Sequence, residues 1–385
     1  MKKICFLTDS IFSIGGVQRV TAVIAKELAR DYDVTIVTFD KPSAEDRTLY
    51  GLQEAPIRYR FFSYPSAGYF KWRFCKIYSF LYRRVLPQTP LTARGYTHSS
   101  FPSEKRWALC RTLKEGHYDV IIGVHAPLAV RLAACRSWLG DTRLIGWVHN
   151  SYEALFGEGS TYVGPQLRKY YEYQLQQLDE TVVLCHYDAK QYPFPTRVIY
   201  NPLTLVPGKP ADGTSKRFLA VGRFSHRHKG FDLLIEAFNL FAQEDSEWTL
   251  DIVGEGPEEA LYRTLIADFG LEQRIRLHPF TNNIQQYYHD AQVYVLSSRW
   301  EGFGLVIVEA MAHGLPVISS DLPTSKEIMG DFGLYFKNGD AAELALRLEE
   351  ATRMDWTTAS AEAIRRAEAF NIEHIIKKWK EMIEQ

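Results

Sequence analysis

Two successive runs of alternating strands and helices constrain the fold of this 385-residue chain more than any other feature. The first run lies within residues 1–200, and the second opens at 217–221, after a segment rich in Pro and Gly at 200–210. Strands that alternate with helices predict doubly wound parallel sheets, with helices on both faces of each sheet. The length suffices for two such domains, each with its own core. We therefore expect an α/β fold with a domain boundary near residue 200.

The apolar patterns place most of the expected elements. Expected strands of the first domain are 3–8, 34–39, 120–124, 144–148 and 181–184, and those of the second are 217–221, 248–253, 274–277, 293–296 and 316–319. Expected helices are 17–29, 341–350, 356–370 and 372–383.

The segment 297–321 contains a glycine-rich turn between a strand and a helix. An apolar run at 291–296 predicts the strand, Gly302 and Gly304 interrupt it, and 305–313 has apolar residues at helical spacing. The glycines therefore lie at a helix N-terminus. Free N–H groups and the helix dipole favour an anion there, and glycine allows the backbone to approach a pyrophosphate closely.

Two carboxylates flank this turn. Glu301 immediately precedes the first glycine, and Glu309 lies about one and a half turns into the helix. Carboxylates accept hydrogen bonds, so their natural ligands are the hydroxyl groups of a sugar or a ribose. The structural alternative is a solvated turn residue together with a Glu that interacts with the helix dipole.

Further candidates follow predicted strands, at the carboxyl ends where open parallel sheets bind ligands. Gly15 and Gly16 open the first helix, so their N–H groups can face a phosphate or an acceptor. Arg223 and Lys229 flank a basic loop after the strand at 217–221. A planar guanidinium and a compact ammonium both suit phosphate oxygens, whereas a solvated surface role is the alternative.

Two histidines also follow strands of the first domain. His125 comes after 120–124, and His149 precedes Asn150 at the end of 144–148. A neutral imidazole can donate to or accept from sugar hydroxyls and can transfer a proton near pH 7. The alternative is a structural histidine at a strand end.

Several of these segments occur together in one known family. In chain order they are Gly15-Gly16-Val17-Gln18-Arg19, Val221-Gly222-Arg223, Lys229-Gly230, 252–257, Glu301-Gly302-Phe303-Gly304-Leu305, Glu309-Ala310-Met311-Ala312 and 314–318. The two glutamates resemble the E-x7-E signature of retaining, nucleotide-sugar-dependent glycosyltransferases of family 4. The resemblance covers nearly the whole chain except about 41–107.

The resemblance implies the GT-B fold, in which two Rossmann-like domains face each other across a cleft. Residues 1–200 would bind the acceptor, 201–370 would bind the nucleotide sugar, and a terminal helix at 371–385 would cross back onto the first domain. The implied reaction moves a hexose or N-acetylhexosamine from a nucleoside diphosphate to a glycan acceptor with retention of configuration. Such reactions build cell-surface polysaccharides such as lipopolysaccharide or capsule. A UDP-sugar is the favoured donor, and guanosine is the alternative base.

The resemblance also implies roles for individual residues. The catalytic set is Glu301, His125, Arg223 and Lys229. The donor-binding set is Gly16, Arg223, Lys229, Phe280, Glu301, Gly302, Phe303, Gly304, Leu305 and Glu309. The acceptor-binding set is Gly15, His149 and Asn150. Within the donor set, Glu309 would hold the ribose hydroxyls, and the backbone near Phe280 would read the base.

No cofactor and no metal are expected. The cationic pair Arg223 and Lys229, with the helix dipole, can neutralise a departing diphosphate, so a divalent metal is unnecessary. The Asp31-Tyr32-Asp33 segment resembles the D-x-D metal motif of another glycosyltransferase fold, but it precedes a strand, at the wrong end of the sheet for a ligand.

The stretch 57–106 bears on the acceptor. It contains ten Lys and Arg residues against one acidic residue, Glu104, with aromatic residues throughout. This composition suits an anionic membrane surface, and we expect an acceptor carried on a lipid pyrophosphate. Nucleic acid is an alternative ligand for such a surface, but no RNA-binding signature accompanies it, so no nucleic-acid partner is expected. The structural alternative is a helix pair packed on its own domain with a solvated basic face.

The charge distribution and the cysteines indicate the cellular compartment in which the protein is expected. Residues 1–200 hold 26 Lys and Arg against 18 Asp and Glu, whereas 201–385 hold 19 against 28, so the first half suits an anionic surface better. The five cysteines form no C-x-x-C pair, which fits a reduced compartment rather than a zinc site. The N-terminal residues read as a strand rather than a signal peptide. We therefore expect a cytoplasmic protein, peripheral on the cytoplasmic face of the membrane.

Other functions can use related architectures. A glycan phosphorylase, a sugar epimerase or a non-catalytic sugar-binding module could have the same two-domain fold, because fold does not fix function. A nicotinamide dehydrogenase is disfavoured, since Gly15-Gly16 follows the first strand where that class has G-x-G-x-x-G.

Overall fold

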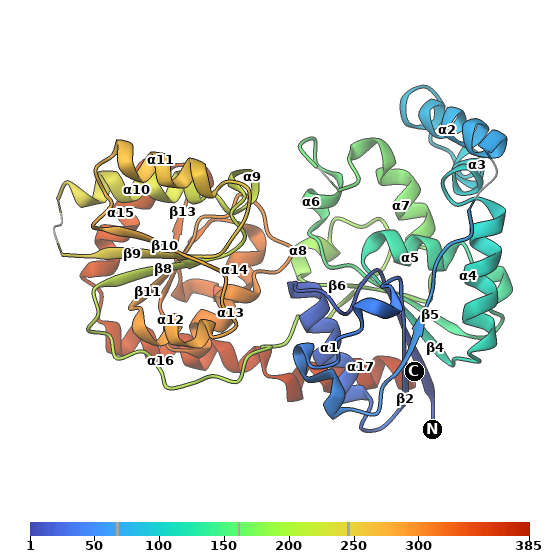
Figure 1. Ribbon diagram of the computed structural model, residues 1–385, viewed down its shortest axis with the longest axis horizontal. Helices are drawn as coiled ribbons and strands as arrows, with labels where there is room; N and C mark the ends of the chain where they lie inside the picture. The colour runs from blue at the N-terminus through green and yellow to red at the C-terminus, as the bar shows by residue number, and fades with distance from the viewer. Residues whose placement is uncertain (67–68, 161, 245–246) are drawn as a thin grey trace. The chain divides into compact units, whose positions relative to one another are not determined.

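The computed structural model describes residues 1–66, 69–160, 162–244 and 247–385. Its contacts divide the chain into two compact units. The first contains Met1–Asn201 and Ile375–Gln385, and the second contains Pro202–His374. Each unit has a parallel sheet with helices on both faces, as the strand and helix alternation predicts (Figure 1).

The first unit has a seven-stranded sheet in the order β3-β2-β1-β4-β5-β6-β7. Its strands are β1 (Lys3–Thr8), β2 (Asp33–Thr38), β3 (Arg58–Phe61), β4 (Val120–Val124), β5 (Arg143–Trp147), β6 (Glu180–Val183) and β7 (Arg197–Val198). Its helices are α1 (Gly16–Leu28), α2 (Tyr69–Arg84), α3 (Pro90–Ser100), α4 (Ser103–Glu115), α5 (Ala126–Ala133), α6 (Tyr152–Phe156), α7 (Arg168–Leu175) and α8 (His186–Ala189). Short 3₁₀ helices are η1 (Pro42–Ala44), η2 (Leu49–Glu54), η3 (Arg136–Trp138) and η4 (Pro165–Leu167).

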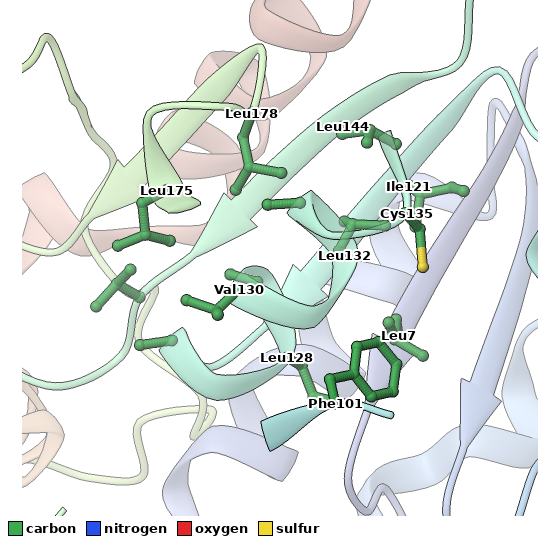
Figure 2. Close-up of a cluster of buried hydrophobic side chains, with 14 of the residues drawn as sticks. Leu7, Phe101, Ile121, Leu128, Val130, Leu132, Cys135, Leu144, Leu175 and Leu178 are labelled. Atoms are coloured by element: carbon green, nitrogen blue, oxygen red, sulfur yellow. The ribbon is translucent and has the colours of Figure 1, made fainter. Parts of the chain in front are cut away.

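The core of this unit lies between the sheet and its helices. Central strands bury nearly every residue, because helices cover both faces of the sheet. Figure 2 shows Leu7 and Ile121 of the strands packed with Leu128 and Leu132 of α5. This packing fixes α5, and therefore fixes His125 just before it.

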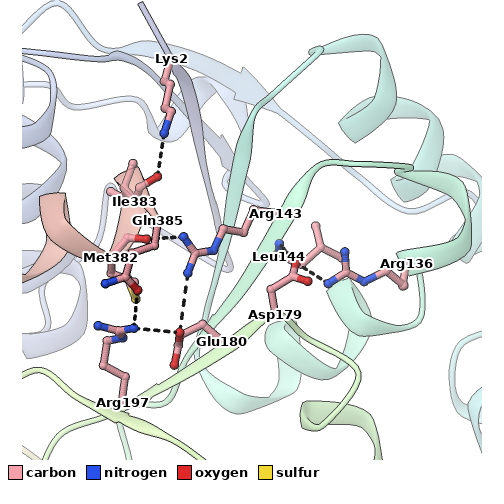
Figure 3. A network of polar contacts seen from close by, with 10 residues as sticks. All are labelled: Lys2, Arg136, Arg143, Leu144, Asp179, Glu180, Arg197, Met382, Ile383 and Gln385. Carbon is pink, nitrogen blue, oxygen red and sulfur yellow. Dashed lines mark hydrogen bonds and ion pairs between the residues drawn. The ribbon is translucent and has the colours of Figure 1, made fainter.

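The last helix, α17 (Ile372–Glu384), packs on the first unit from Ile375 onward. Trp379 is fully buried, and its ring centroid lies 4.7 Å from that of Trp147 on β5. Lys2 donates a hydrogen bond to the carbonyl of Ile383 at 3.0 Å, and Arg143 donates to the carbonyl of Met382, near the helix end (Figure 3). Cations at the C-terminal carbonyls satisfy groups that the helix leaves unpaired.

The second unit has a six-stranded parallel sheet in the order β10-β9-β8-β11-β12-β13. Its strands are β8 (Arg217–Val221), β9 (Thr249–Val253), β10 (Ile275–His278), β11 (Val293–Leu296), β12 (Val317–Ser320) and β13 (Leu334–Phe336). Its helices are α9 (His226–Lys229), α10 (Phe231–Ala242), α11 (Glu259–Asp268), α12 (Ile284–Asp290), α13 (Leu305–Ala312), α14 (Pro323–Met329), α15 (Ala341–Thr352) and α16 (Trp356–Ala367), with 3₁₀ helices η5 (Gly330–Phe332) and η6 (Glu368–Phe370). Aromatic residues such as Phe218, Phe238 and Trp248 fill its core.

All ten predicted strands are present, and their ends differ from the expected ones by at most one residue. β3, β7 and β13 were not among the expected strands. β3 and β7 lie at the two edges of the first sheet, and their residues are mostly half-buried. Edge strands need no continuous apolar run, so the hydrophobic pattern does not reveal them. Within the described ranges, no helix is long and apolar enough to cross a membrane.

Candidate functional site

The turn before α13 forms the centre of the candidate site in the second unit. Gly304 has φ 91°, a left-handed conformation that glycine adopts without strain, and it caps the helix that begins at Leu305. Phe303 is buried, with its ring 5.8 Å from that of Phe370. The half-buried Gly302 lies between Phe303 and Glu301. The turn thus places helix N–H groups at the end of β11, as the sequence predicts.

Glu301 is buried and paired with Lys229. Its Oε1 accepts from Lys229 Nζ at 2.6 Å and from Ser298 Oγ at 2.6 Å. Burial favours the neutral form of Glu301, but the charges of Lys229 and His228 and these hydrogen bonds outweigh burial and hold its pKa below the usual 4.5. The carboxylate is therefore ionised at neutral pH.

The loop that carries Lys229 is held against β11 by a close backbone contact. Gly230 has φ 64°, and a Cβ on it would lie 2.1 Å from the carbonyl oxygen of Ser297. Ser297 Oγ in turn donates to the carbonyl of Lys229 at 2.9 Å. Only glycine permits this approach, so Gly230 helps to place the lysine beside Glu301.

Aromatic stacking and an ion pair support the same loop. The ring of His228 stacks on Trp300 with centroids 5.2 Å apart, and burial lowers the pKa of His228. Arg299 makes a two-point ion pair with Asp232, at 3.0 and 2.7 Å. These partners are not among the candidate residues that the sequence pattern indicates. Ser298 and Trp300, however, lie in the same segment as Glu301.

Glu309 is buried one turn into α13. Its carboxylate accepts from Tyr288 OH at 3.0 Å and from Thr204 Oγ1 at 3.4 Å. The ring of the fully buried His313 stacks on Tyr288, 4.9 Å between centroids. These contacts fix the orientation of the carboxylate, and none of them involves a cation. Glu309 and Glu301 thus differ in environment.

The remaining donor candidates lie at other strand ends. Arg223 is exposed after β8, and across the described residues it forms no ion pair. Phe280 follows β10 and is 41% exposed. The structure joins neither of them to the Lys229 and Glu301 pair by a direct contact in the described part of the chain.

In the first unit, hydrogen bonds to two residues hold the loop between β1 and α1. These two residues are not among the candidates that the sequence pattern indicates. Asp40 accepts from the backbone N–H of Ile11 at 2.8 Å and from Ser10 Oγ at 2.7 Å. Tyr50 OH accepts from the N–H of Gly15 at 2.8 Å. Gly16 is exposed as the first residue of α1.

His125 and His149 lie beside each other at the ends of β4 and β5. Their ring centroids are 5.4 Å apart, and the N–H of His125 donates to the carbonyl of Trp147 at 2.9 Å. His125 has φ 72°, an uncommon conformation for a residue other than glycine. Such strain at a strand end is more frequent at functional sites.

His149 is buried, and neither ring nitrogen has a hydrogen-bond partner within the described ranges. Burial lowers its pKa well below the usual value, with a further contribution from His125, whose own pKa burial also lowers. Both imidazoles are therefore neutral at pH 7 and suited to hydroxyl groups rather than to phosphate. Asn150 is half-buried next to His149, just before the cap of α6.

The motif Asp31-Tyr32-Asp33 lies at the amino end of β2. Asp33 pairs with Arg58 of β3, and Asp31 pairs with Lys380 of α17 at 2.5 Å. Over the residues that the structure describes, no group of three or more His, Cys, Asp or Glu is placed to hold a metal ion.

Comparison with known proteins gives the family. The model of Glycosyltransferase Family 4 matches residues 14–205, and that of Glycosyl transferases group 1 matches 205–369. Together they span 14–369, so the chain belongs to these glycosyltransferases, and the resemblance in the motifs is confirmed.

Relatives and solved structures agree with this assignment. A Haemophilus influenzae protein described as an uncharacterized glycosyltransferase is 26% identical, over 99% of each chain. The lipopolysaccharide 1,6-galactosyltransferase of Salmonella typhimurium is 30% identical over 32% of this chain and 36% of its own. The structure of Anabaena HepE in complex with UDP and glucose superposes with a TM-score of 0.74, at 21% identity and over 100% of each chain. The solved structures confirm the GT-B fold. The family models and the relatives show that the protein is a glycosyltransferase.

Proposed function

We propose that the protein is a retaining glycosyltransferase that moves a hexose or N-acetylhexosamine from a nucleoside diphosphate sugar to a glycan acceptor. A UDP-sugar is the favoured donor, and the acceptor is carried on a lipid during synthesis of a cell-surface polysaccharide. The observation that carries the proposal is the buried Glu301–Lys229 pair beside the glycine-rich start of α13. Names of relatives support the biological setting, because they include lipopolysaccharide and other polysaccharide glycosyltransferases.

In this proposal, unit 2 holds the donor. Arg223, Lys229 and the N–H groups at Gly304 and Leu305 hold the diphosphate, which gains charge as the sugar leaves. Glu301 accepts hydrogen bonds from hydroxyls of the transferred sugar, and the backbone near Phe280 reads the base.

Unit 1 then supplies the acceptor side. Gly15, His149 and Asn150 bind the acceptor, and Gly16 and the neutral His125 contact the donor. The only change of covalent bonds is the exchange of the sugar between two oxygens, so the proton of the acceptor hydroxyl must leave. We propose that the leaving phosphate accepts it on the same face, because neither Glu301 nor Glu309 is free of hydrogen-bonded partners that would weaken a nucleophile.

The donor is tested by thermal stabilisation of the purified protein with UDP, GDP and their sugar conjugates. Selective stabilisation by one nucleotide and its sugars is expected, since a ligand that binds only the folded state raises the melting temperature. Stabilisation by no nucleotide would contradict the proposal.

Catalysis should not depend on a divalent metal. Lys229 and Arg223 provide the positive charge that a metal would otherwise bring to the leaving diphosphate. Turnover should therefore be unchanged after exhaustive chelation with EDTA. Loss of turnover that magnesium restores would show that these cations are insufficient.

The outer face of α2 supports contact with a membrane. Phe74, Ile77, Phe80 and Leu81 are exposed on it, with Phe74 at 74%, and Val85 just after the helix is 70% exposed. The helix contains no acidic residue. Exposed apolar side chains beside cations suit the interface of an anionic bilayer. Of the predicted surface 57–106, residues 67–68 and the side chains of 69–72 lie outside the described residues.

The protein should co-float with liposomes that contain anionic lipid, and less with neutral ones or at high salt. Replacement of Phe74 and Phe80 by serine should reduce flotation about tenfold or more, because each exposed aromatic loses apolar burial in the bilayer. Leu346→Ser is the control, since the exposure of Leu346, 63%, lies between those of Phe80 and Phe74, but Leu346 lies on α15 of the other unit. Absence of flotation with anionic lipid would remove the membrane from the proposal.

A further inference from the structure

A cavity of about 300 Å³ lies within the first unit, between α2, α3, α5 and α7. Its lining combines seven polar side chains with five apolar ones. The polar ones are Arg83, Tyr96, Ser100, Arg131, Tyr162, Tyr170 and Tyr171. None of them belongs to the donor or acceptor sets described above.

Two guanidinium groups give the cavity its charge. Arg83 donates from Nε and Nη2 to Tyr96 OH, at 3.2 and 3.0 Å. Arg131 Nη1 lies 3.5 Å from Tyr64 OH, with its guanidinium over that ring. Neither arginine has a carboxylate at ion-pair distance among the described residues, whereas Arg299 and Arg136 each have an aspartate. The lining therefore carries two cations without an acidic partner.

A phenol lines the cavity together with the two arginines. Burial raises the pKa of the Tyr171 hydroxyl, and the charges of Arg131 and Arg83 only partly oppose this rise. Tyr171 therefore remains protonated and can donate a hydrogen bond. Arginine forks and tyrosine hydroxyls are the donors that recognise phosphate oxygens.

The cavity adjoins the candidate acceptor site through α5. His125 immediately precedes this helix, and Arg131 lies six residues further along it, a rise of roughly 9 Å. Pro127 and Val130 of the same helix also line the cavity. Along the helix axis, Arg131 is thus separated from His125 by roughly the length of two linked sugar residues.

We infer that this cavity binds a phosphate or diphosphate group of the acceptor through Arg83 and Arg131. Two unpaired cations match a phosphate with two negative charges better than a single sugar carboxylate. The inference rests on the proposed function, because it assumes that unit 1 receives the acceptor. It adds the chemical class of the acceptor and the residues that would select it.

Inorganic pyrophosphate is the first probe, measured by titration calorimetry on protein saturated with UDP, so that the nucleotide occupies the donor site. We expect binding that weakens roughly tenfold in Arg83→Gln and in Arg131→Gln, because each loses a charge-assisted hydrogen bond. Arg131→Lys should be intermediate, since it keeps the charge but not the fork. Arg94→Gln is the matched control, because Arg94 is also exposed and also donates to a tyrosine hydroxyl, that of Tyr173.

A second probe, farnesyl diphosphate, distinguishes the source of the phosphate. Tighter binding than pyrophosphate, with the same dependence on the two arginines, would support a lipid-linked acceptor. Equal binding of both probes with that dependence would support a soluble phosphorylated glycan in the same site. Equal affinity in wild type, Arg83→Gln and Arg131→Gln, or no binding of either probe, would overturn the inference.

A failure of the proposed function gives a different result, because UDP then does not bind the wild-type protein. The pyrophosphate titration is in that case repeated on Lys229→Met without UDP, since this variant lacks the donor-side lysine and any remaining binding is attributed to the cavity. Melting temperatures of all variants are measured alongside, and the exposed Arg83 provides a variant whose fold should be unaffected.

Discussion

Replacement of Lys229 by methionine should lower turnover by roughly 10²- to 10³-fold, the cost of removing one preorganised group that stabilises charge in the transition state. In the proposed mechanism this lysine neutralises the leaving diphosphate. The change also leaves Glu301 buried without its cation, which should cost about 3 kcal/mol of folding stability. Steady-state kinetics and denaturant unfolding measure the two effects.

The pH dependence of folding stability tests whether the unpaired Glu301 carboxylate causes this loss of stability. In the wild type, the pKa of Glu301 is lowered, so its stabilising contribution is present above 4.5 and is lost as the pH falls through the folded-state pKa. In Lys229→Met the lysine charge no longer opposes the effect of burial on Glu301. The pKa of Glu301 should therefore rise above 4.5, and the variant should lose stability as the pH rises from 4.5 through this raised pKa. The stability difference between the two proteins should therefore be smallest in acid.

Two further variants separate folding from catalysis. Lys229→Met combined with Glu301→Gln removes both charges, so stability should largely return while turnover stays low. Lys326→Met is the matched control, because Lys326 forms an exposed ion pair with Asp321 at 3.5 Å. Such a pair contributes less than about 1 kcal/mol. Full activity in the double variant would contradict the role given to this pair.

Glu309→Ala should weaken binding of the donor nucleotide by roughly 10- to 100-fold, because hydrogen bonds from ribose hydroxyls to a carboxylate are lost. The stabilisation that the nucleotide gives to wild type should shrink accordingly when measured at one nucleotide concentration. Glu309→Gln keeps the size of the side chain, so its affinity for the nucleotide should lie between those of the wild type and Glu309→Ala.

Two control variants test whether the effect of Glu309→Ala comes from the carboxylate at this position. Tyr288→Phe removes the hydroxyl that donates to Glu309 at 3.0 Å but keeps the charge, so nucleotide binding should fall less than in Glu309→Ala. Glu349→Ala removes a carboxylate that pairs with Arg353 on the surface, and binding should be unchanged. Undiminished nucleotide binding in Glu309→Ala would place the ribose elsewhere.

The strands that form the centres of both sheets could be predicted because both of their faces are buried. The strands at 3–8, 120–124 and 293–296 consist mainly of apolar residues, and each is present in the structure with nearly every residue buried. Likewise, glycine between a strand and a helical pattern correctly predicted the turn at Gly304. Local pattern alone is sufficient for such features.

The supporting contacts of the site could not be predicted in the same way. Tyr50 binds Gly15 across 35 positions of sequence, and Lys229 reaches Glu301 across 72. Tertiary packing creates such pairs, and no spacing rule links their members. The cavity between α2, α3, α5 and α7 shows the same limit, since Arg83 and Arg131 come from α2 and α5.

Analysis of the reaction products by proton NMR tests the central claim most directly, with the nucleotide sugar that stabilises the protein most and an acceptor fraction from cell envelopes. The account predicts that nucleoside diphosphate and a new glycoside form together, only when acceptor is present, and that the glycoside has the anomeric configuration of the donor. Inversion at the anomeric carbon, a requirement for free phosphate, or conversion of the sugar without any acceptor would contradict it.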